Sequence, residues 1–377
     1  MRQGSAHAIS LVLGSTSSAQ RSSDRAFLSG RPVPTTLSTW IPDPKGLAFD
    51  LPVSGQERFM RWRWAVGGLP LLVACSGSAT SGPTLSSSPT QPIPLEGKIA
   101  ITRLDGSHQR IYVINADGSG LVKISTGDSW EDFIPAWSPN GQHIVFVRSY
   151  SPYGQKDLYV ANADGSGTER LTSTPTNEET PAWSPDGKRI AFADFLTRGK
   201  DAHLWVMNAD GSARMQLTRG PPTVDMVPSW SPDGRRIVFE RHFDDADNSS
   251  NADLFLMNAN GSHLVRLTHD HARNAAWSPD GTRIAYWADS AGDPIKILDL
   301  SSGNATTLLE ADSVTFVGSE CGVVPTWSPD GTEIAWAGCE ADPTDLYVMA
   351  ADGTHLTKIP NTQGSSDPAW MPMRNGA

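Results

Sequence analysis

Residues 181–192 read Pro-Ala-Trp-Ser-Pro-Asp-Gly-Lys-Arg-Ile-Ala-Phe, and this stretch decides the fold. Two short apolar runs flank a Ser-Pro-Asp-Gly turn. In such a turn Pro presets φ, Asp accepts a hydrogen bond from the backbone two residues on, and Gly adopts a positive φ. The stretch therefore predicts a β-hairpin.

The same Pro-x-Trp pattern, or a close variant of it, recurs along the chain. Its Trp residues are Trp137, Trp183, Trp230, Trp277, Trp327 and, in a broken last copy, Trp370. Successive Trp residues are 46, 47, 47, 50 and 43 positions apart. A period in this range, with several short strands in each unit, is typical of a β-propeller. We expect the repeated Trp side chains to pack between adjacent blades rather than to stack on a ligand.

Each unit supplies two further predicted strands. Residues 204–211, Leu-Trp-Val-Met-Asn-Ala-Asp-Gly, predict a third strand and a second turn, and runs such as 169–172, Glu-Arg-Leu-Thr, predict a fourth strand. At the ends of the array, residues 98–124 supply three strands without a Pro-x-Trp strand, and residues 368–372 supply a Pro-x-Trp strand alone. The sequence therefore predicts an all-β fold, a six-bladed β-propeller of four-stranded blades, closed by pairing of the N- and C-terminal strands.

The repeat of Trp-Ser-Pro-Asp-Gly-x-x-Ile-Ala-Phe followed by Leu-Tyr-Val-Met-Asn-Ala-Asp-Gly-Ser resembles the WD-like repeat of the propeller domain in the TolB translocation protein family. The resemblance covers residues 97–377 in six imperfect copies. That family also has an α/β domain before its propeller, and nothing in this sequence corresponds to it. The resemblance therefore implies the propeller, and not the function of the α/β domain.

The N-terminal quarter has a different character. Residues 1–59 contain no sustained apolar period and are interpreted as an unstructured or non-native preface. Residues 60–74 have a short basic start and an apolar stretch too short to span a bilayer, as a signal peptide does. The run Leu-Val-Ala-Cys ending at Cys75 resembles the lipobox of bacterial lipoproteins, which implies lipidation of Cys75. The alternative is an apolar linker with a chance Cys.

Because a signal peptide belongs at the N-terminus, we expect translation to begin at Met60; a real extended leader is the alternative. Residues 75–96 are rich in Ser, Thr and Pro and predict a solvated tether before the propeller. The predicted location is extracytoplasmic, in the periplasm or at the cell surface, with attachment to a bacterial membrane through lipidated Cys75.

The net charge of the chain is −11. Residues 1–74 hold eight Lys and Arg and four Asp and Glu, so their removal leaves 22 basic and 37 acidic residues and a net charge of −15. Such a charge repels phosphate backbones and anionic membrane surfaces. Nucleic acid is therefore excluded as a partner, and the lipid is the expected means of membrane attachment.

The two remaining cysteines, Cys321 and Cys339, flank one predicted hairpin whose turn, residues 328–331, lies midway between them. Export to a compartment that permits disulfides and their expected cross-strand position predict a Cys321–Cys339 disulfide. The alternative is two reduced thiols.

Two clusters could hold a metal ion. His269, Asp270 and His271 offer imidazole ligands, but no third His is near in sequence, so a surface loop is favoured. Residues 245–253 place oxygen ligands at alternate positions, but they lack the central Gly and terminal Glu of a calcium loop, so a solvated acidic loop is favoured. No cofactor is expected.

Two classes of function remain. No Gly-x-Ser-x-Gly nucleophile elbow is present, so a peptidase is not indicated. We expect a monomeric module that binds a protein or envelope component. The alternative is a metal- or carboxylate-dependent lyase or glycosidase at the mouth of the propeller channel.

The loops before the Pro-x-Trp strands should emerge on one side of the propeller, because neighbouring strands alternate in direction. Loops on a rigid scaffold are where binding residues concentrate. These loops carry the candidate binding face, an acidic rim with aromatic and imidazole members: Trp130, Glu131, Asp132, Glu178, Glu179, Asp225, His269, His271 and Asp367. The alternative is an ordinary solvated rim.

Overall fold

The computed structural model describes residues 97–150, 154–196, 201–220, 223–243, 251–288, 295–309, 324–338 and 344–372. The strands, in chain order, are β1 (Lys98–Asp105), β2 (His108–Asn115), β3 (Val122–Lys123), β4 (Glu131–Trp137), β5 (His143–Ser149), β6 (Lys156–Asn162), β7 (Glu169–Arg170), β8 (Asn177–Trp183), β9 (Arg189–Phe195), β10 (Ala202–Asn208), β11 (Met215–Gln216), β12 (Val224–Trp230), β13 (Arg236–His242), β14 (Ala252–Asn258), β15 (Val265–Arg266), β16 (Ala272–Trp277), β17 (Arg283–Ala288), β18 (Ile295–Asp299), β19 (Ala305–Leu309), β20 (Thr326–Trp327), β21 (Glu333–Gly338), β22 (Asp345–Ala350), β23 (Thr357–Lys358) and β24 (Ser365–Trp370). Over these ranges the chain has no helix with the length and apolar character of a bilayer-crossing segment.

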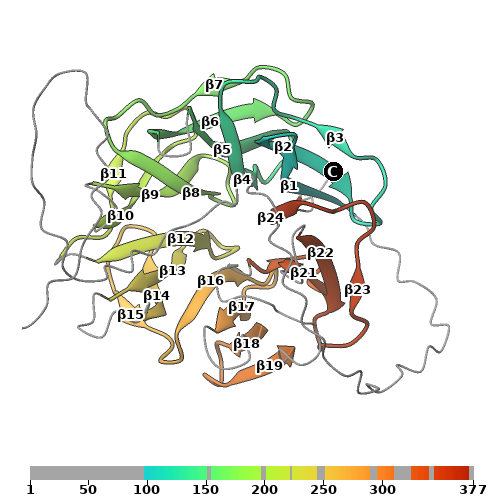
Figure 1. Cartoon of the computed structure of the whole chain (residues 1–377). Coiled ribbons are helices and arrows are strands. Elements are labelled where there is room, and N and C mark those ends of the chain that lie inside the picture. Colours follow the sequence, from blue (N-terminus) through green and yellow to red (C-terminus); the bar gives the residue numbers. More distant parts are fainter. Residues whose placement is uncertain are drawn as a thin grey trace, which may run out of the picture. The chain divides into compact units, whose positions relative to one another are not determined.

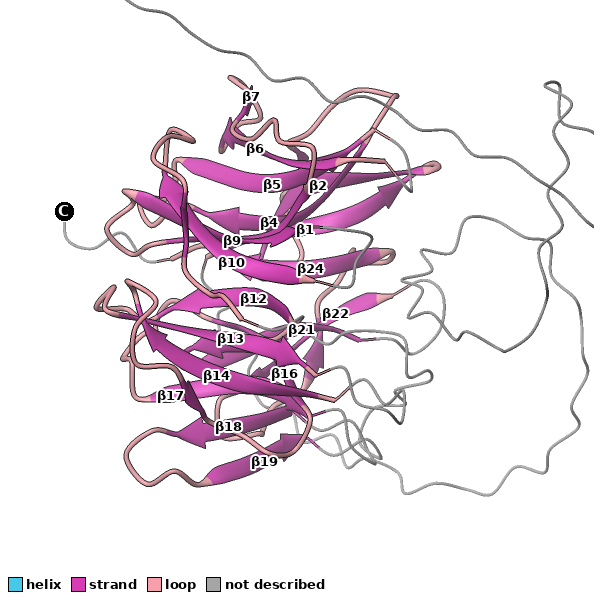
Figure 2. Ribbon diagram, turned by 90° about the vertical axis from the view of Figure 1, so that its left-hand side faces the viewer, coloured by secondary structure: helices cyan, strands magenta, loops and turns pink. Residues whose placement is uncertain are grey.

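The strands form sheets that surround a common centre (Figure 1). Four sheets have four strands each, in the orders β24-β1-β2-β3, β4-β5-β6-β7, β16-β17-β18-β19 and β20-β21-β22-β23. The remaining sheet has eight strands and combines β8–β11 with β12–β15. Figure 2 shows the strands running across the view, with their connections at both ends. The prediction of an all-β propeller is confirmed.

One feature differs from a set of separate four-stranded sheets. The Ala202 N–H donates to the Thr223 carbonyl at 3.0 Å, and Ala202 pairs in parallel with Val224. This single contact joins the start of β10 to the start of β12. It fuses two four-stranded units into the eight-stranded sheet, because the two strand ends meet at the same side of the molecule.

The predicted hairpin is present in residues 181–192. Trp183 of β8 lies opposite Ile190 of β9. Between them, the Gly187 N–H donates to the Ser184 carbonyl at 2.9 Å, and Gly187 has a φ of 68°. The hairpin forms because Gly can adopt this positive φ without the steric cost of a Cβ.

The repeated Trp residues pack between neighbouring units, as predicted. Trp137, Trp230, Trp277, Trp327 and Trp370 are all buried, each less than a tenth exposed. Several of them also form a hydrogen bond to the preceding unit. The indole N–H of Trp137 donates to the Ala369 carbonyl at 3.1 Å, that of Trp230 to Ala182 at 3.2 Å, and that of Trp327 to Ala276 at 3.1 Å.

The apolar core lies between the units rather than in one central mass. Six buried hydrophobic clusters occur among the described residues, and each combines side chains from two units that follow one another. One of them packs Ile99 and Ile101 of β1 and Trp370 of β24 against Leu346 and Val348 of β22. Burial of these apolar surfaces is the main force that holds the sheets face to face.

The two ends of the array share one sheet. β24 pairs antiparallel with β1, with Ile99 opposite Trp370 and Ala100 opposite Ala369. The isolated Pro-x-Trp strand near the C-terminus therefore lies beside the three strands that begin the array, as the sequence predicts.

Candidate functional site

A β-bulge distorts the same point of several Pro-x-Trp strands. The bulged residues Ile134, Thr180, Val227, Asn274 and Asp367 have φ values of 53°, 50°, 52°, 52° and 48°. Positive φ is unusual for any residue other than Gly and costly for β-branched side chains. The bulge shifts the pairing register by one residue between the start and the end of the strand.

The shifted register places an acid at the strand start opposite an arginine of the next strand. Asp132 of β4 pairs with Arg148 of β5, with Nε to Oδ1 at 2.6 Å and Nη2 to Oδ2 at 2.9 Å. Asp225 of β12 pairs with Arg241 of β13 in the same bidentate way, at 2.6 and 2.8 Å. Both aspartates are fully buried. These carboxylates therefore fix the strand starts and are not available to a ligand.

The unit that begins with β8 places two acids in that position. Glu178 lies opposite Asp194, and Arg214 forms ion pairs with both carboxylates. Glu178 also accepts hydrogen bonds from Thr172, at 3.0 Å, and from Thr174. Burial raises the pKa of Glu178, and its hydrogen bonds and the Arg214 charge oppose that rise. The single Arg214 guanidinium thus balances one of the two carboxylate charges and holds both groups in place.

The arginine of the first ion pair is also enclosed by aromatic rings. The guanidinium carbon of Arg148 lies 4.4 Å from the ring centre of Trp130 and 4.6 Å from that of Tyr159. Tyr150, which is about half exposed, packs edge-on against Trp130 and hydrogen bonds to the Tyr159 hydroxyl at 2.7 Å. Cation–π contacts of this kind add to the ion pair and hold Trp130 in place.

Two of these strands, β4 and β8, carry a second acid beside the first, and it is also paired but less buried. Glu131 accepts from the ring nitrogen of His108 at 3.0 Å and from the backbone of Gln109. Glu179 accepts from Lys156 at 2.8 Å. Both glutamates are only partly buried. They bridge neighbouring strands at the margin of the candidate face.

The imidazole members of the predicted face lie just before β16. His269 and His271 are exposed, whereas Asp270 between them is bound by Lys296 at 2.8 Å and by the Tyr286 hydroxyl at 3.1 Å. Asp270 is therefore engaged by a cation of its own chain. Over the described ranges no three His, Cys, Asp or Glu side chains gather in a way that could hold a metal ion.

Asp367 connects the last unit to the first. Its carboxylate accepts hydrogen bonds from the Thr102 and Ser366 hydroxyls and from the Ile134 N–H, and burial raises its pKa. The same Ile134 N–H also lies 3.0 Å from the Thr102 hydroxyl. An analogous contact links the Val227 N–H to the Thr180 hydroxyl at 3.2 Å. Polar side chains of one unit thus hold the bulge of the next.

The residues of the predicted rim therefore fall into two groups, one buried and one exposed. Asp132, Glu178 and Asp225 belong to strands rather than loops and are buried ion-pair partners, while His269 and His271 are exposed. The role of the rim in binding stays a prediction. Cys75, Cys321, Cys339 and the acidic loop within 245–250 lie outside the described residues.

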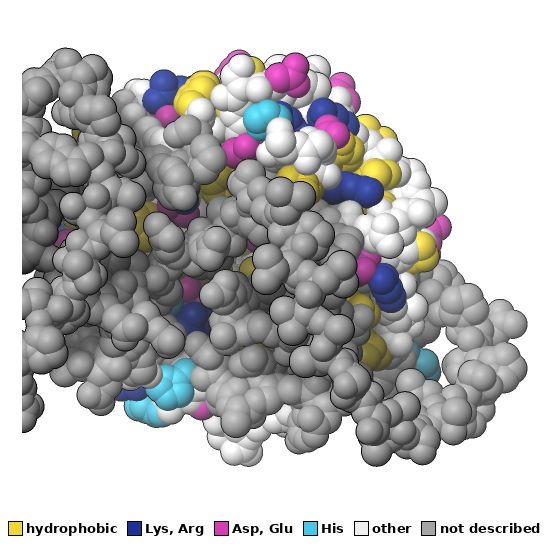
Figure 3. All heavy atoms as spheres, viewed as in Figure 1, with side chains coloured by type: hydrophobic (Ala, Val, Ile, Leu, Met, Phe, Trp, Pro, Cys, Tyr) yellow, Lys and Arg dark blue, Asp and Glu magenta, His cyan; other side chains and the backbone are white. Residues whose placement is uncertain are grey.

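Sequence reasoning did not find the arginines that bind the rim acids. A signal was present, because Arg148 and Arg241 each follow their aspartate by the same 16 residues. On the described part of the face in Figure 3, Lys and Arg side chains lie among Asp and Glu side chains. The buried acids Asp132, Glu178 and Asp225 are bound to arginines, which does not favour the lyase or glycosidase alternative.

Comparison with known proteins identifies the repeat. The TolB beta propeller domain family matches residues 88–195 and 175–374. The Tol-Pal system protein TolB of Rhizorhabdus wittichii is 36% identical over 74 residues, which are 20% of this chain and 16% of that protein. TolB 1 of Novosphingobium aromaticivorans is 37% identical over 76 residues, again 20% of this chain and 16% of the relative. The matched segment is thus about a sixth of these relatives' length.

Solved structures show the same fold at low sequence identity. TolB from Acinetobacter baumannii superposes with a TM-score of 0.61 and 20% identity, over 74% of this chain and 68% of that one. A putative TolB from Agrobacterium tumefaciens gives 0.55 and 18%, over 73% and 92%. The match of the family over most of the chain is the decisive finding. This chain belongs to the family of the TolB beta propeller domain.

Proposed function

We propose that this protein is an extracytoplasmic binding module, attached to a membrane by lipid on Cys75, whose propeller binds a protein of the cell envelope. The family match over residues 88–374 carries the proposal. Relatives that match a segment of this chain are named Tol-Pal system protein TolB, and we propose the envelope partner by analogy with them. Rigid propellers commonly use their loops for binding.

The binding face we propose is the side on which β4, β8, β12 and β16 begin. Buried ion pairs such as Asp132–Arg148 and Asp225–Arg241 hold the strand starts in fixed positions. Exposed side chains, among them His269, lie on the loops next to these fixed strand starts. A rigid frame lowers the entropy lost when a partner binds, which favours affinity. The buried acids support the face, and the exposed side chains contact the partner.

In-cell crosslinking tests this face. A photo-crosslinking phenylalanine derivative at His269 should capture one envelope protein, because His269 is exposed and its backbone has no positive φ to be strained. The same group at Lys188, an exposed residue in the β8–β9 turn, should capture none, because that turn lies at the opposite end of the strands. Capture of the same proteins from both positions would contradict the proposed face, as would capture from neither.

We further propose that the domain is a closed ring of six blades. Each Pro-x-Trp strand and the three strands paired outward from it would form one blade, with β24 completing the blade of β1, β2 and β3. The pairing of β24 with β1 and the six clusters between consecutive units support this arrangement. Ring closure would leave only short, protected sheet edges.

A further inference from the structure

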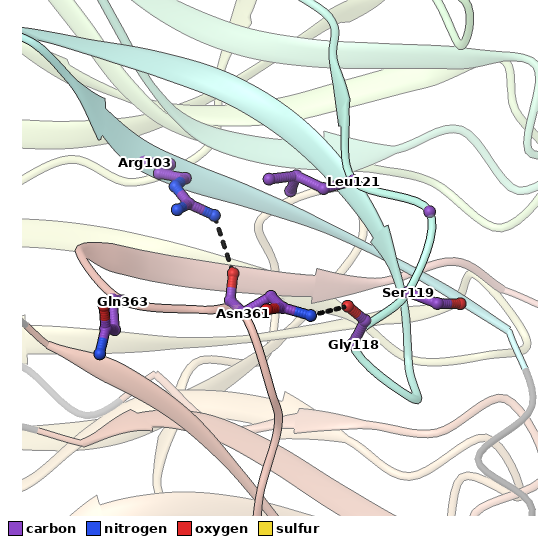
Figure 4. Close-up of a pocket in the computed structure, with 7 residues that line it drawn as sticks. Arg103, Gly118, Ser119, Leu121, Asn361 and Gln363 are labelled. Carbon is purple, nitrogen blue, oxygen red and sulfur yellow. Dashed lines mark hydrogen bonds between the residues drawn. The ribbon is translucent and has the colours of Figure 1, made fainter.

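A pocket of about 380 Å³ opens beside the sheet that joins the two ends of the array (Figure 4). It is lined by Arg103 of β1, by residues 118–121 of the β2–β3 turn, and by Asn361 and Gln363 of the segment before β24. This volume falls near the lower end of the range for small-molecule sites. The β2–β3 turn lies at the strand ends away from the proposed binding face, whereas Arg103 lies beside Ser365, where β24 begins.

Arg103 is the charged group of this pocket. Its Nη1 donates to the Asn361 carbonyl at 2.8 Å, and its guanidinium carbon lies 6.0 Å from the Tyr112 ring centre. Within the described residues no carboxylate forms an ion pair with Arg103, in contrast to Arg148 and Arg241. The rest of the planar guanidinium can therefore donate to a ligand, while the bond to Asn361 fixes its position.

The other lining groups add donors and an apolar wall but no negative charge. Gln363 is exposed, and its amide has no partner among the described residues. Leu121 is 37% exposed and gives an apolar surface. The hydroxyl of Ser119 is already used, because it donates to Asp117 at 2.6 Å and accepts from Asn115 at 2.9 Å.

The turn that forms one wall depends on two glycines. Gly118 and Gly120 have φ values of 81° and 65°. A Cβ on Gly118 would collide with the backbone carbonyl of Pro360, and one on Gly120 would meet the Asn115 amide at 2.6 Å. The glycines let the β2–β3 turn lie close to the segment before β24, where the Asn361 amide donates to the Gly118 carbonyl at 3.0 Å. The wall is thus fixed in shape.

We propose that this pocket binds a carboxylate carried on a short aliphatic group, such as the C-terminus of a peptide. The planar fork of Arg103 matches a planar carboxylate, Gln363 can donate a further hydrogen bond, and Leu121 contacts the aliphatic part. A monoanion suits the pocket better than a dianionic phosphate. The pocket has one cation, and the chain's net charge of −11 repels the second negative charge.

Calorimetric titration of the full chain tests the chemistry with simple probes. N-acetyl-alanyl-alanine should bind saturably and raise Tm, because a ligand that binds the folded state stabilises it. Its C-terminal amide should not bind. N-acetyl-glutamate α-amide carries only a side-chain carboxylate. If it binds, the pocket accepts acidic side chains as well as peptide C-termini. Inorganic phosphate binding more tightly than the free acid would overturn the assignment to a carboxylate.

Two variants and a matched control locate the binding. Arg103→Gln should weaken binding of the acid by about tenfold or more, the loss expected for a charge-assisted hydrogen-bonded pair. Arg103→Gln also removes the hydrogen bond from Arg103 to the Asn361 carbonyl. A second variant therefore leaves Arg103 and this bond intact. Gln363→Glu should weaken binding at least as strongly, because it adds a negative charge to the lining of the pocket. Arg235→Gln makes the same charge change at an exposed turn and should leave the affinity unchanged. Unaltered binding in both pocket variants would overturn the proposal.

Discussion

Glu333 occupies a position at which three other units of the repeat have an arginine. It begins β21, whereas β9, β13 and β17 begin with an arginine at the same place. Each of those arginines lies over the Trp of the following unit, with guanidinium-to-ring distances of 4.7, 4.9 and 4.8 Å. Glu333 is buried instead, and burial, with a smaller contribution from the Asp330 charge, raises its pKa to about 7.

The raised pKa of Glu333 predicts a pH dependence of stability. Below the unfolded-state pKa of about 4.5 the group is protonated in both states and costs nothing. As pH rises to about 7, the unfolded chain loses the proton first, so the free energy of unfolding falls by up to about 3 kcal/mol. Urea unfolding of wild type and Glu333→Gln at pH 4 and pH 8 measures this.

The Gln variant should match wild type at pH 4 and be more stable at pH 8, because Gln carries no charge to bury. An equal difference between the two proteins at both pH values would mean that Glu333 does not carry the effect.

The buried ion pair of Asp225 and Arg241 predicts a strong asymmetry between single and double substitutions. Asp225→Ala leaves the Arg241 guanidinium, whose side chain is only 12% exposed, without a counter-ion and should lower the free energy of unfolding by about 3 kcal/mol. Adding Arg241→Met should restore part of that loss, because no buried charge is then left unpaired. Denaturant unfolding of both variants makes the comparison. A double variant less stable than the single one would exclude the explanation by an unpaired charge.

At the scale of the strand, the hairpins could be read from the sequence and the bulges could not. The Trp spacing and the Ser-Pro-Asp-Gly turns fix where β8 and β9 lie, since turn chemistry is local. Nothing local marks Ile134 or Val227 as residues of positive φ, because β-branched side chains disfavour it. The arginine that binds Asp132 is fixed by the strand register, which the bulge sets. Because the bulge cannot be predicted, the sequence alone assigns this acid to a solvated loop.

The strand β24 gives a prediction for the pairing of the two ends. Removing residues 366–377 deletes most of β24 and takes Trp370 out of its cluster with Ile99 and Leu346. The free energy of unfolding should fall by several kcal/mol, as expected for loss of buried core. Removing only residues 373–377 is the matched control. If both truncated proteins melt like the parent, β24 does not support the fold.

At the scale of the whole molecule, attachment to the membrane rests on one residue. Cys75→Ala should release the propeller into the soluble extracytoplasmic fraction, because one lipidated residue then no longer holds it. Fractionation of cells followed by detection of the propeller measures this. Ser76→Ala, next to the proposed lipid site, is the control and should stay with the membranes. Retention of the Cys75 variant in the membrane fraction would contradict lipidation.

The pairing of β1 with β24 also has a consequence for biosynthesis. Strand β1 leaves the ribosome, or emerges from a translocation channel, more than 260 residues before its partner Ala369 and Trp370. Contacts of such high sequence separation form late, because a long loop must close before they are made. The first sheet of the propeller in sequence is thus the last to be completed, and until then the inner edge of β1 is exposed to chaperones and to other unfinished chains.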